Sequence, residues 1–243
     1  MDQTFRFLSQ IAIRPLADER VHARFLTDRD LPALLELEQE KWTDVQAASR
    51  AQLQARIDAH PDLAVGAFCS RSGRLLASLF MRPVADDFHR CVTTWEDCTL
   101  LPSPATGTTL FGISLTSRDR AGVTALLKFF WPYALKRGWR YIYLGSPVPG
   151  LRDWMAARPE GHVEDYVHAR RRGLPLDPQL RYYASRGFDR IVSIKRDYFP
   201  HERSLDYGVL LRGTVPLSIL RPVWSALALP TIQRIAHPLA ALL

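Results

Sequence analysis

Leucines recur at three- and four-residue spacing directly after Thr27-Asp28-Arg29-Asp30, which predicts an amphipathic helix capped by Thr27 or Asp30. A second helix is predicted over residues 48–59, because the residue before Pro61 disfavours helical backbone. The neighbouring apolar runs are strand-like. They predict a short strand over residues 22–26 and a β-hairpin around a turn at residues 71–73, with strands over residues 64–69 and 75–81.

The second half of the chain is dominated by one long helix. Apolar positions after residue 124 recur at helical spacing, and this helix is predicted to kink at Pro132 and to end at Gly138. A shorter helix is predicted to start at Asp177-Pro178 and to end at Gly187. Strands are predicted over residues 90–101, 110–116, 139–145, 189–195 and 206–212, and an insertion with helical patches occupies residues 147–175.

These elements predict an α/β fold with a mixed, twisted sheet of about seven strands flanked by helices. We expect one domain over residues 22–213, preceded by a lead-in segment over residues 1–21. Residues 214–243 are far more apolar and predict a helical tail of two short amphipathic helices separated by Pro230. Such a tail is expected to cap the domain, to pair two copies, or to lie on a membrane surface.

The net charge of +7 suits an anionic ligand. No pattern of a nucleic-acid-binding module accompanies it, so we expect no nucleic acid partner. Cys69, Cys91 and Cys98 do not form a disulfide framework and are expected to be buried or half-buried free thiols; no metal site is predicted either. With no apolar run long enough for a membrane span and no secretory signal, a cytoplasmic protein is expected.

The turn at residues 117–124, between a predicted strand and the long helix, is the candidate for ligand chemistry. A helix N-terminus offers unpaired N–H groups and a partial positive charge to phosphate, and Gly122 lets the backbone come close. Arg118 and Arg120 add cations, and the Thr124 hydroxyl can hydrogen-bond a phosphate oxygen. Asp119 is expected to repel phosphates if it faces them. In the alternative interpretation, Gly122 only allows a tight turn and the arginines are solvated.

The order of strand, glycine-bearing turn, helix, strand, helix, Tyr183-Ala-Ser-Arg-Gly-Phe188 and strand resembles the GNAT superfamily of N-acyltransferases. The resemblance implies that acetyl-CoA or another acyl-CoA is the co-substrate. At the turn, the sequence departs from the family pattern, because Asp119 stands where the family usually has Arg or Gln. The implied cofactor-binding residues are Ile113, Ser114, Leu115, Arg118, Arg120, Ala121, Gly122, Val123 and Thr124.

Tyr183 occupies the position of the tyrosine that commonly protonates the leaving thiolate in this superfamily. A phenol of pKa near 10 can give a proton to a thiolate of pKa near 8.5. A packing role is the alternative, because Tyr182 is adjacent on a short helix and one of the two must face the core.

The other candidates lie on predicted strands. Glu96 and Asp97 follow Trp95, and alternation along a strand would turn only one of the two carboxylates toward the acceptor. Glu96 is our candidate for a catalytic base, and Trp95 and Ser146 are candidates for substrate binding.

From Thr94 onward, the similarity narrows to a GNAT subgroup found beside carbon-nitrogen hydrolases and in polyketide synthase loading modules. Members of this subgroup handle acyl groups on CoA and on acyl carrier protein, and some are malonyl decarboxylases with a Thr and a His near the thioester. Ser146 and Tyr182 or Tyr183 stand at those two positions here. The similarity is carried by residues 94–95, 110–113, 147–150, 164–167, 177–181, 187–188, 197–200 and 204–211.

We therefore expect acyl transfer, most simply of an acetyl group, from acyl-CoA to a small-molecule amine. One alternative is acyl transfer or decarboxylation on acyl carrier protein in a biosynthetic pathway. The other is a non-catalytic GNAT-like binding or regulatory module. The basic run at residues 170–172 is expected to be solvated or to dock an acidic carrier protein, and the tail to support a homodimer or a peripheral membrane contact.

Overall fold

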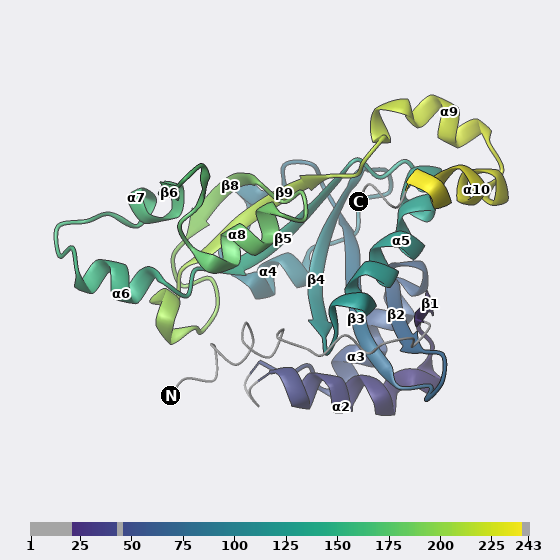
Figure 1. The fold of residues 1–243 in the computed structure, drawn as a ribbon, viewed down its shortest axis with the longest axis horizontal. Helices are drawn as coiled ribbons and strands as arrows, with labels where there is room; N and C mark the ends of the chain where they lie inside the picture. Colours follow the sequence, from purple (N-terminus) through teal and green to yellow (C-terminus); the bar gives the residue numbers. More distant parts are fainter. Residues whose placement is uncertain (1–20, 43–45, 240–243) are drawn as a thin grey trace. The chain divides into compact units, whose positions relative to one another are not determined.

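The computed structural model describes residues 21–42 and 46–239, so the predicted lead-in lies almost entirely outside the described residues. Its main sheet has seven strands in the order β1-β2-β3-β4-β5-β9-β8, with helices along it (Figure 1). The predicted fold class is thereby confirmed. The strands are β1 Val21–Phe25, β2 Ala64–Cys69, β3 Leu75–Val84, β4 Thr109–Ser117, β5 Tyr141–Pro147, β8 Arg190–Lys195 and β9 Gly208–Thr214.

The described chain divides into two compact units. Unit 1 contains the described residues up to Arg82, together with Gly112–Lys136 and the residues from Ala226 onward. Unit 2 contains Pro83–Phe111 and Arg137–Ser225. The division of the sequence at residues 22–213 and 214–243 stays a prediction.

Unit 1 contains the predicted hairpin, in which β2 pairs with β3 in antiparallel register and β1 adds to the other side of β2. All of β2 is buried, which explains its continuous apolar run. Phe25 packs edge-on against Phe129 and Tyr133 of the long helix, with ring centroids 5.1 and 4.9 Å apart. The helices of this unit are α2 Leu31–Lys41, α3 Arg50–Ala59, α5 Arg120–Arg137 and α10 Leu229–Leu239, with 3-10 turns η1 Asp28–Asp30 and η2 Pro61–Leu63.

The helix starts of unit 1 follow the expected chemistry. The Asp30 carboxylate accepts a hydrogen bond from the Thr27 N–H at 2.9 Å and pairs with Arg24 at 2.7 Å, so both predicted capping residues take part. At α3, the Ser49 hydroxyl accepts from the Gln52 N–H at 3.3 Å. Pro132 lies inside α5, and its kink stays a prediction.

Unit 2 is built on the antiparallel strands β5, β9 and β8, with α8 Pro178–Ala184 across them (Figure 1). The strands predicted over residues 189–195 and 206–212 are present as β8 and β9, which pair in antiparallel register. The insertion forms α6 Leu151–Ala156, α7 Val163–His168 and a two-stranded ribbon, β6 Arg170–Arg171 and β7 Leu174–Pro175. Its core combines side chains of these helices with the sheet: Val148, Leu151, Val163, Tyr166, Val167, Leu180, Val209 and Leu211.

Tyr198 fills space over two glycines of this sheet. A Cβ atom at Gly145 would lie 2.5 Å from the Tyr198 ring, and one at Gly208 would lie 2.1 Å from it. The ring is 1% exposed, so the two glycines are required for its close approach to β5 and β9.

The predicted strand over residues 90–101 is wrong. This segment contains a 3-10 turn, η3 Phe88–Arg90, and then the helix α4 Trp95–Leu100. The cause is a capping box: the Thr94 Oγ1 accepts from the Asp97 N–H at 3.0 Å, and the Asp97 carboxylate accepts from the Thr94 N–H at 2.8 Å. These bonds favour a helix start over the extended backbone that the apolar pattern indicated.

The tail contains η5 Ser218–Leu220 and α9 Arg221–Ala226, and then α10. The two helices predicted for the tail are present, but Pro230 does not separate them, because it is the second residue of α10. Proline is tolerated there because the first N–H groups of a helix have no partner within it. Among the residues that the structure describes, no helix is both long and apolar enough to cross a membrane.

Candidate active site

The turn between β4 and α5 is closed by Asp119. Its Oδ1 accepts a hydrogen bond from the Ala121 N–H at 2.6 Å, and its carbonyl oxygen accepts from the Val123 N–H at 3.3 Å. The Asp119 N–H donates to the Ser117 Oγ at 3.1 Å. Asp119 therefore caps α5, and a carboxylate already occupies part of the terminus that was predicted to receive phosphate.

Arg118 is engaged by acidic side chains of α2. Its Nη2 donates to the Glu36 carboxylate at 2.7 Å, its Nε donates to Glu40, and its Nη1 donates to the Leu75 carbonyl oxygen at 2.8 Å. Only 7% of the Arg118 side chain is exposed. The guanidinium thus fastens the end of β4 to α2 and β3.

The remaining residues of the turn differ in what they offer a ligand. Gly122 lies against β3, since an added Cβ would stand 3.1 Å from the Cβ atoms of both Leu76 and Ala77. The Thr124 hydroxyl donates to the Arg120 carbonyl oxygen at 3.1 Å, which uses its proton inside the helix. The Arg120 side chain is exposed and can reach an anion in solution.

The strand before the turn carries an unsatisfied hydroxyl. Ser114 Oγ is buried and has no hydrogen-bond partner among the described residues. A buried hydroxyl without a partner costs free energy unless a ligand or water supplies one. Ile113 is buried and Leu115 half-buried on either side of it, and the contact of β4 with pantetheine stays a prediction.

Another polar cluster ties α2 to β4. The buried Glu38 accepts a hydrogen bond from the Thr116 hydroxyl at 2.6 Å and one from the Ala48 N–H at 3.2 Å. The Trp42 Nε1 donates to Thr116 Oγ1 at 2.9 Å. Sequence reasoning missed this cluster, because a Glu at a helical position between leucines gives no signal that it is buried.

Tyr183 lies on α8 against the core of unit 2. Its ring meets Phe188 edge-on, with centroids 6.4 Å apart, and Tyr182 at 5.5 Å. Desolvation raises the pKa of Tyr183 to about 12, although the Gln179 side chain hydrogen-bonds to it and opposes the shift. The phenol is therefore protonated throughout the neutral range, as an acid catalyst must be.

Ser146 lies on the same side of the sheet as α8. It stands opposite Val209 on β9, two residues after Leu144, and both Leu144 and Tyr183 pack on the unit 2 core. Its hydroxyl donates to the Pro147 carbonyl oxygen at 2.9 Å, and the residue is fully buried. The structure thus brings Ser146 and Tyr183 to one face of β5 within unit 2.

Trp95 and Glu96 lie on α4 instead of on a strand. Trp95 is half-buried, and its N–H donates to the Tyr198 carbonyl oxygen at 2.8 Å. Glu96 is exposed. Hydrogen bonds from Thr94 and Thr93 lower the pKa of the Asp97 carboxyl. Glu96 was chosen as a base because side chains alternate along a strand, and this reason does not apply to a helix. The position of Glu96 therefore gives no support to a catalytic role.

Asp177 holds α8 in place. It is fully buried, and its Oδ1 accepts from the N–H groups of Gln179 and Leu180 at 2.8 and 3.1 Å. Its Oδ2 accepts from the Tyr166 hydroxyl at 2.7 Å and from the Gly150 N–H at 3.2 Å. Because one carboxylate joins α6, α7 and α8, it fixes the helix that carries Tyr183.

Groups of metal-ligating side chains and the three cysteines are the other features to consider for chemistry. Among the described residues, no group of three or more His, Cys, Asp and Glu side chains is arranged to hold a metal ion. Cys69 and Cys98 are buried, whereas Cys91 is exposed, contrary to the prediction, and none of the three is in a disulfide. The buried Cys98 Sγ lies 3.6 Å from the Tyr198 hydroxyl, and burial raises the pKa of that thiol.

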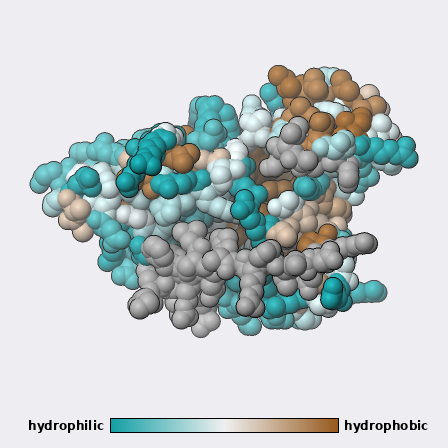
Figure 2. Space-filling model, viewed as in Figure 1, coloured by the Kyte–Doolittle hydropathy of each residue, from teal (hydrophilic) through white to brown (hydrophobic). Residues whose placement is uncertain are grey.

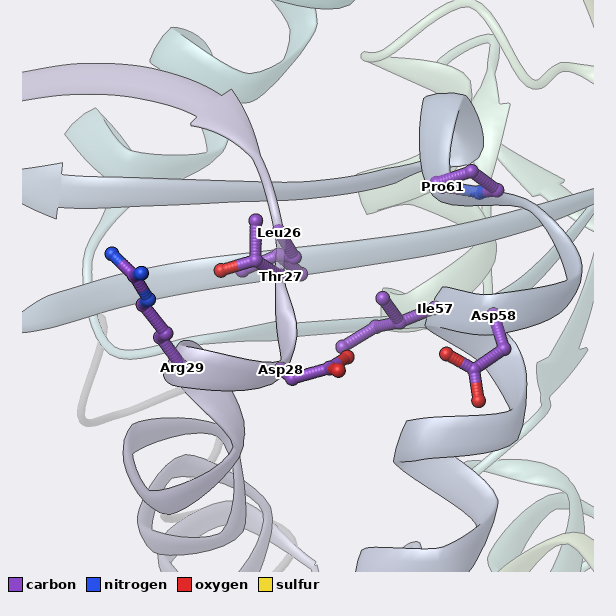
Figure 3. A pocket seen from close by; sticks show the side chains of 7 residues that line it. All are labelled: Leu26, Thr27, Asp28, Arg29, Ile57, Asp58 and Pro61. Carbon is purple, nitrogen blue, oxygen red and sulfur yellow. The ribbon is translucent and has the colours of Figure 1, made fainter.

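A hollow of about 460 Å³ opens on unit 1 between η1 and α3 (Figure 3). Figure 3 shows Arg29 pointing away from Asp28 and Asp58, whose carboxylates both accept from the Gln54 amide at 2.6 and 2.9 Å. No residue predicted for catalysis or cofactor binding lines it. The hollow is lined by Leu26, Thr27, Asp28, Arg29, Ile57, Asp58 and Pro61.

The strand order, the β4–α5 turn and the tyrosine on α8 define the class of fold, and comparison with solved structures agrees. No protein-family model matches the chain, and no curated protein matches it. Many solved structures do match, and they include proteins of the GNAT fold. The chain therefore has the GNAT fold, and the predicted resemblance is confirmed.

Two of these structures come from the predicted subgroup. The GNAT-like decarboxylase GphF in complex with isobutyryl-CoA is 26% identical, with a TM-score of 0.65 over 80% of this chain and 99% of that chain. The loading GNATL domain of CurA from Lyngbya majuscula is 18% identical, with a TM-score of 0.67 over 81% and 98%. Ard1 from Thermoplasma volcanium is 12% identical, with a TM-score of 0.51 over 80% and 97%.

Proposed function

We propose that this protein is an acyltransferase that takes the acyl group of acyl-CoA and transfers it to an amine. The observation that carries the proposal is the 26% identity to a GNAT-like decarboxylase bound to isobutyryl-CoA, over nearly all of that protein. The acetyl group as the acyl unit and a small-molecule amine as the acceptor belong to this proposal.

In the proposed reaction, the amine nitrogen attacks the thioester carbonyl carbon, and the carbon–sulfur bond breaks. The leaving thiolate takes the Tyr183 proton, while the proton lost by the amine passes through water and restores the phenol. The products are an amide and free CoA thiol. Burial raises the pKa of Tyr183 to about 12, so the phenol holds its proton at neutral pH when the amine attacks.

Unit 1 supplies the proposed contacts to the CoA portion of the donor. The exposed Arg120 is a cation for the phosphates, and Ser114 Oγ offers a hydrogen bond to the pantetheine arm. Ala121, Gly122, Val123 and Thr124 form the first turn of α5 that the phosphates approach. We assign Arg118 a structural role, because two carboxylates and a carbonyl oxygen already hold its guanidinium.

A second candidate function is acyl transfer or decarboxylation on acyl carrier protein. Asp119 favours it, because the carboxylate that caps α5 repels the phosphates of CoA. A carrier protein presents the same pantetheine thioester but has only a single phosphodiester. The Asp119 carboxylate therefore repels it less than it repels CoA. The similar structure from CurA is a loading domain, which is compatible with such a substrate.

Calorimetric titration with acetyl-CoA, malonyl-CoA, free CoA and an acylated carrier protein separates these functions. The proposal predicts saturable binding of at least one acyl-CoA. Binding of the carrier protein alone would favour the second candidate. If none of the four ligands bound at millimolar concentration, the chain would be a non-catalytic module and the acyltransferase proposal would be wrong.

A further inference from the structure

A group of exposed apolar side chains gathers where β9 leads into α9. Leu217, Ile219, Leu220 and Val223 are 39%, 83%, 45% and 51% exposed, and we call them the α9 patch. Figure 2 shows hydrophobic surface concentrated over α9. The patch is built on a fixed support, because the Trp224 ring is buried and its Nε1 donates to the Leu217 carbonyl oxygen at 2.8 Å. Contiguous exposed apolar side chains of this kind mark contact surfaces.

Three arginines lie at the ends of β5, β8 and β9, close in the chain or in the sheet register to the segment that leads into the patch. The Val215 N–H donates to the Arg140 carbonyl oxygen at 2.9 Å, which places Arg140 next to the chain that enters the patch. The guanidinium carbons of Arg140 and Arg212 lie 5.4 and 4.5 Å from the centre of the Tyr141 ring. Arg190 is directly opposite Arg212 in the β8–β9 register. We call Arg140, Arg190 and Arg212 the cationic rim.

The three residues of the rim are all cationic. Two like charges directly opposite on neighbouring strands destabilise the sheet, and a bound anion relieves that repulsion. The sequence has no Asp or Glu after Asp206, whereas Arg212, Arg221 and Arg234 all follow it. A surface that is apolar at its centre and cationic at its edge complements anionic lipid headgroups over an acyl layer.

We propose that the α9 patch and the cationic rim bind the surface of an anionic lipid membrane. Ile219 and Val223 enter the interface, and the arginines of the rim contact lipid phosphates. A second copy of this chain fits the surface less well, because a two-fold contact places the same patch and therefore the same cationic rim on both sides. The inference is independent of the proposed acyl transfer.

The test is co-sedimentation with phosphatidylcholine vesicles, with and without 30% phosphatidylglycerol. The full chain is expected to bind the anionic vesicles and to be released by about 0.5 M salt, because salt at that level screens charges beyond a few ångströms. The variant Ile219→Ser/Val223→Ser is expected to bind at least about tenfold more weakly, since it exposes far less apolar area. Arg140→Gln/Arg190→Gln is expected to weaken binding to the anionic vesicles alone.

Leu100→Ser is the matched control, because Leu100 is 73% exposed on α4 of the same unit. It is expected to bind vesicles like the unchanged protein. Equal binding by the Ile219→Ser/Val223→Ser variant, or no binding of the full chain to anionic vesicles, would overturn the proposal. A concentration-dependent dimer in light scattering that this variant abolishes, without vesicle binding, would assign the patch to a second copy instead.

Discussion

The carboxylate of Asp119 at the start of α5 makes a prediction that can be worked from the structure. Asn is as good an N-cap as Asp, so Asp119→Asn keeps an oxygen acceptor for the Ala121 N–H, now 2.6 Å from Oδ1, and removes only the charge. The cost to folding is limited to the lost interaction with the helix dipole, roughly 0.3–1 kcal/mol. The variant therefore separates the charge of this residue from its capping role.

The expected gain in ligand affinity follows from Coulomb's law. A phosphate at the same helix end would stand about 5 Å from the carboxylate, where two unit charges repel by roughly 3 kcal/mol at an effective dielectric constant near 20. Asp119 is half-buried, so screening by solvent reduces this to about 1–2 kcal/mol. Asp119→Asn should therefore bind CoA about 5- to 30-fold more tightly at low salt.

Calorimetry with free CoA at about 50 mM and 1 M salt measures this effect, which should nearly vanish at the higher concentration as the Debye length falls to about 3 Å. Asp58→Asn is the matched control, because Asp58 is an exposed carboxylate in the same unit that accepts only from the Gln54 amide among the described residues. An affinity for CoA that is unchanged or lower in Asp119→Asn at low salt would refute the reasoning.

Four further outcomes are expected. Tyr183→Phe should lower kcat by about 10²- to 10⁴-fold with little change in KM, whereas Tyr182→Phe should leave kcat unchanged. The reaction rate should not fall near pH 10, where an ordinary tyrosine loses its proton, because the Tyr183 pKa is raised to about 12. A fall in rate at pH 10 would contradict this. Gly122→Val should lower the free energy of unfolding in urea by roughly 1–3 kcal/mol, because its side chain overlaps β3. Asp177→Ala should lower Tm by at least about 5 °C, since it strips the partner from the buried Tyr166 hydroxyl and three N–H groups.

A helix or strand could be predicted from the sequence where its apolar residues recur at a regular spacing and a capping or turn residue marks its end. The β2–β3 hairpin has two apolar runs around a glycine turn, and Gly73 has a φ of 71° there. The helix α8 starts at an Asp-Pro pair that caps it. In both cases the pattern and the local chemistry agree, so the assignment needed no long-range information.

The predictions were wrong where a residue type is common in two different structural roles. Thr94-Trp95-Glu96-Asp97 has the aromatic character of a strand and the spacing of a capping box, and the hydrogen bonds of Thr94 and Asp97 decide for a helix. Asp119 was compared with a phosphate-binding position, although an Asp just before a helix is also a common cap. The same capping rule that identified α8 would have identified this role.

Contacts between residues distant in the sequence could not be predicted. The Asp177 carboxylate joins Gly150 and Tyr166, which are 27 and 11 residues away from it. Arg118 pairs with Glu36 across 82 residues. A single sequence gives no signal for such partners, because every charged or polar residue elsewhere in the chain is an equal candidate until the fold is known. The roles of Arg118 and Asp177 therefore became visible only in the structure.

The central claim is that this protein breaks the thioester of an acyl-CoA. The most direct measurement is the release of free CoA thiol from acetyl-CoA or malonyl-CoA, followed with a thiol reagent in the presence of a panel of small amines. The account predicts thiol release that saturates with acyl-CoA and is accompanied by an amide product in mass spectrometry. Release no faster than in buffer for both donors, from protein shown by circular dichroism to be folded, would contradict it.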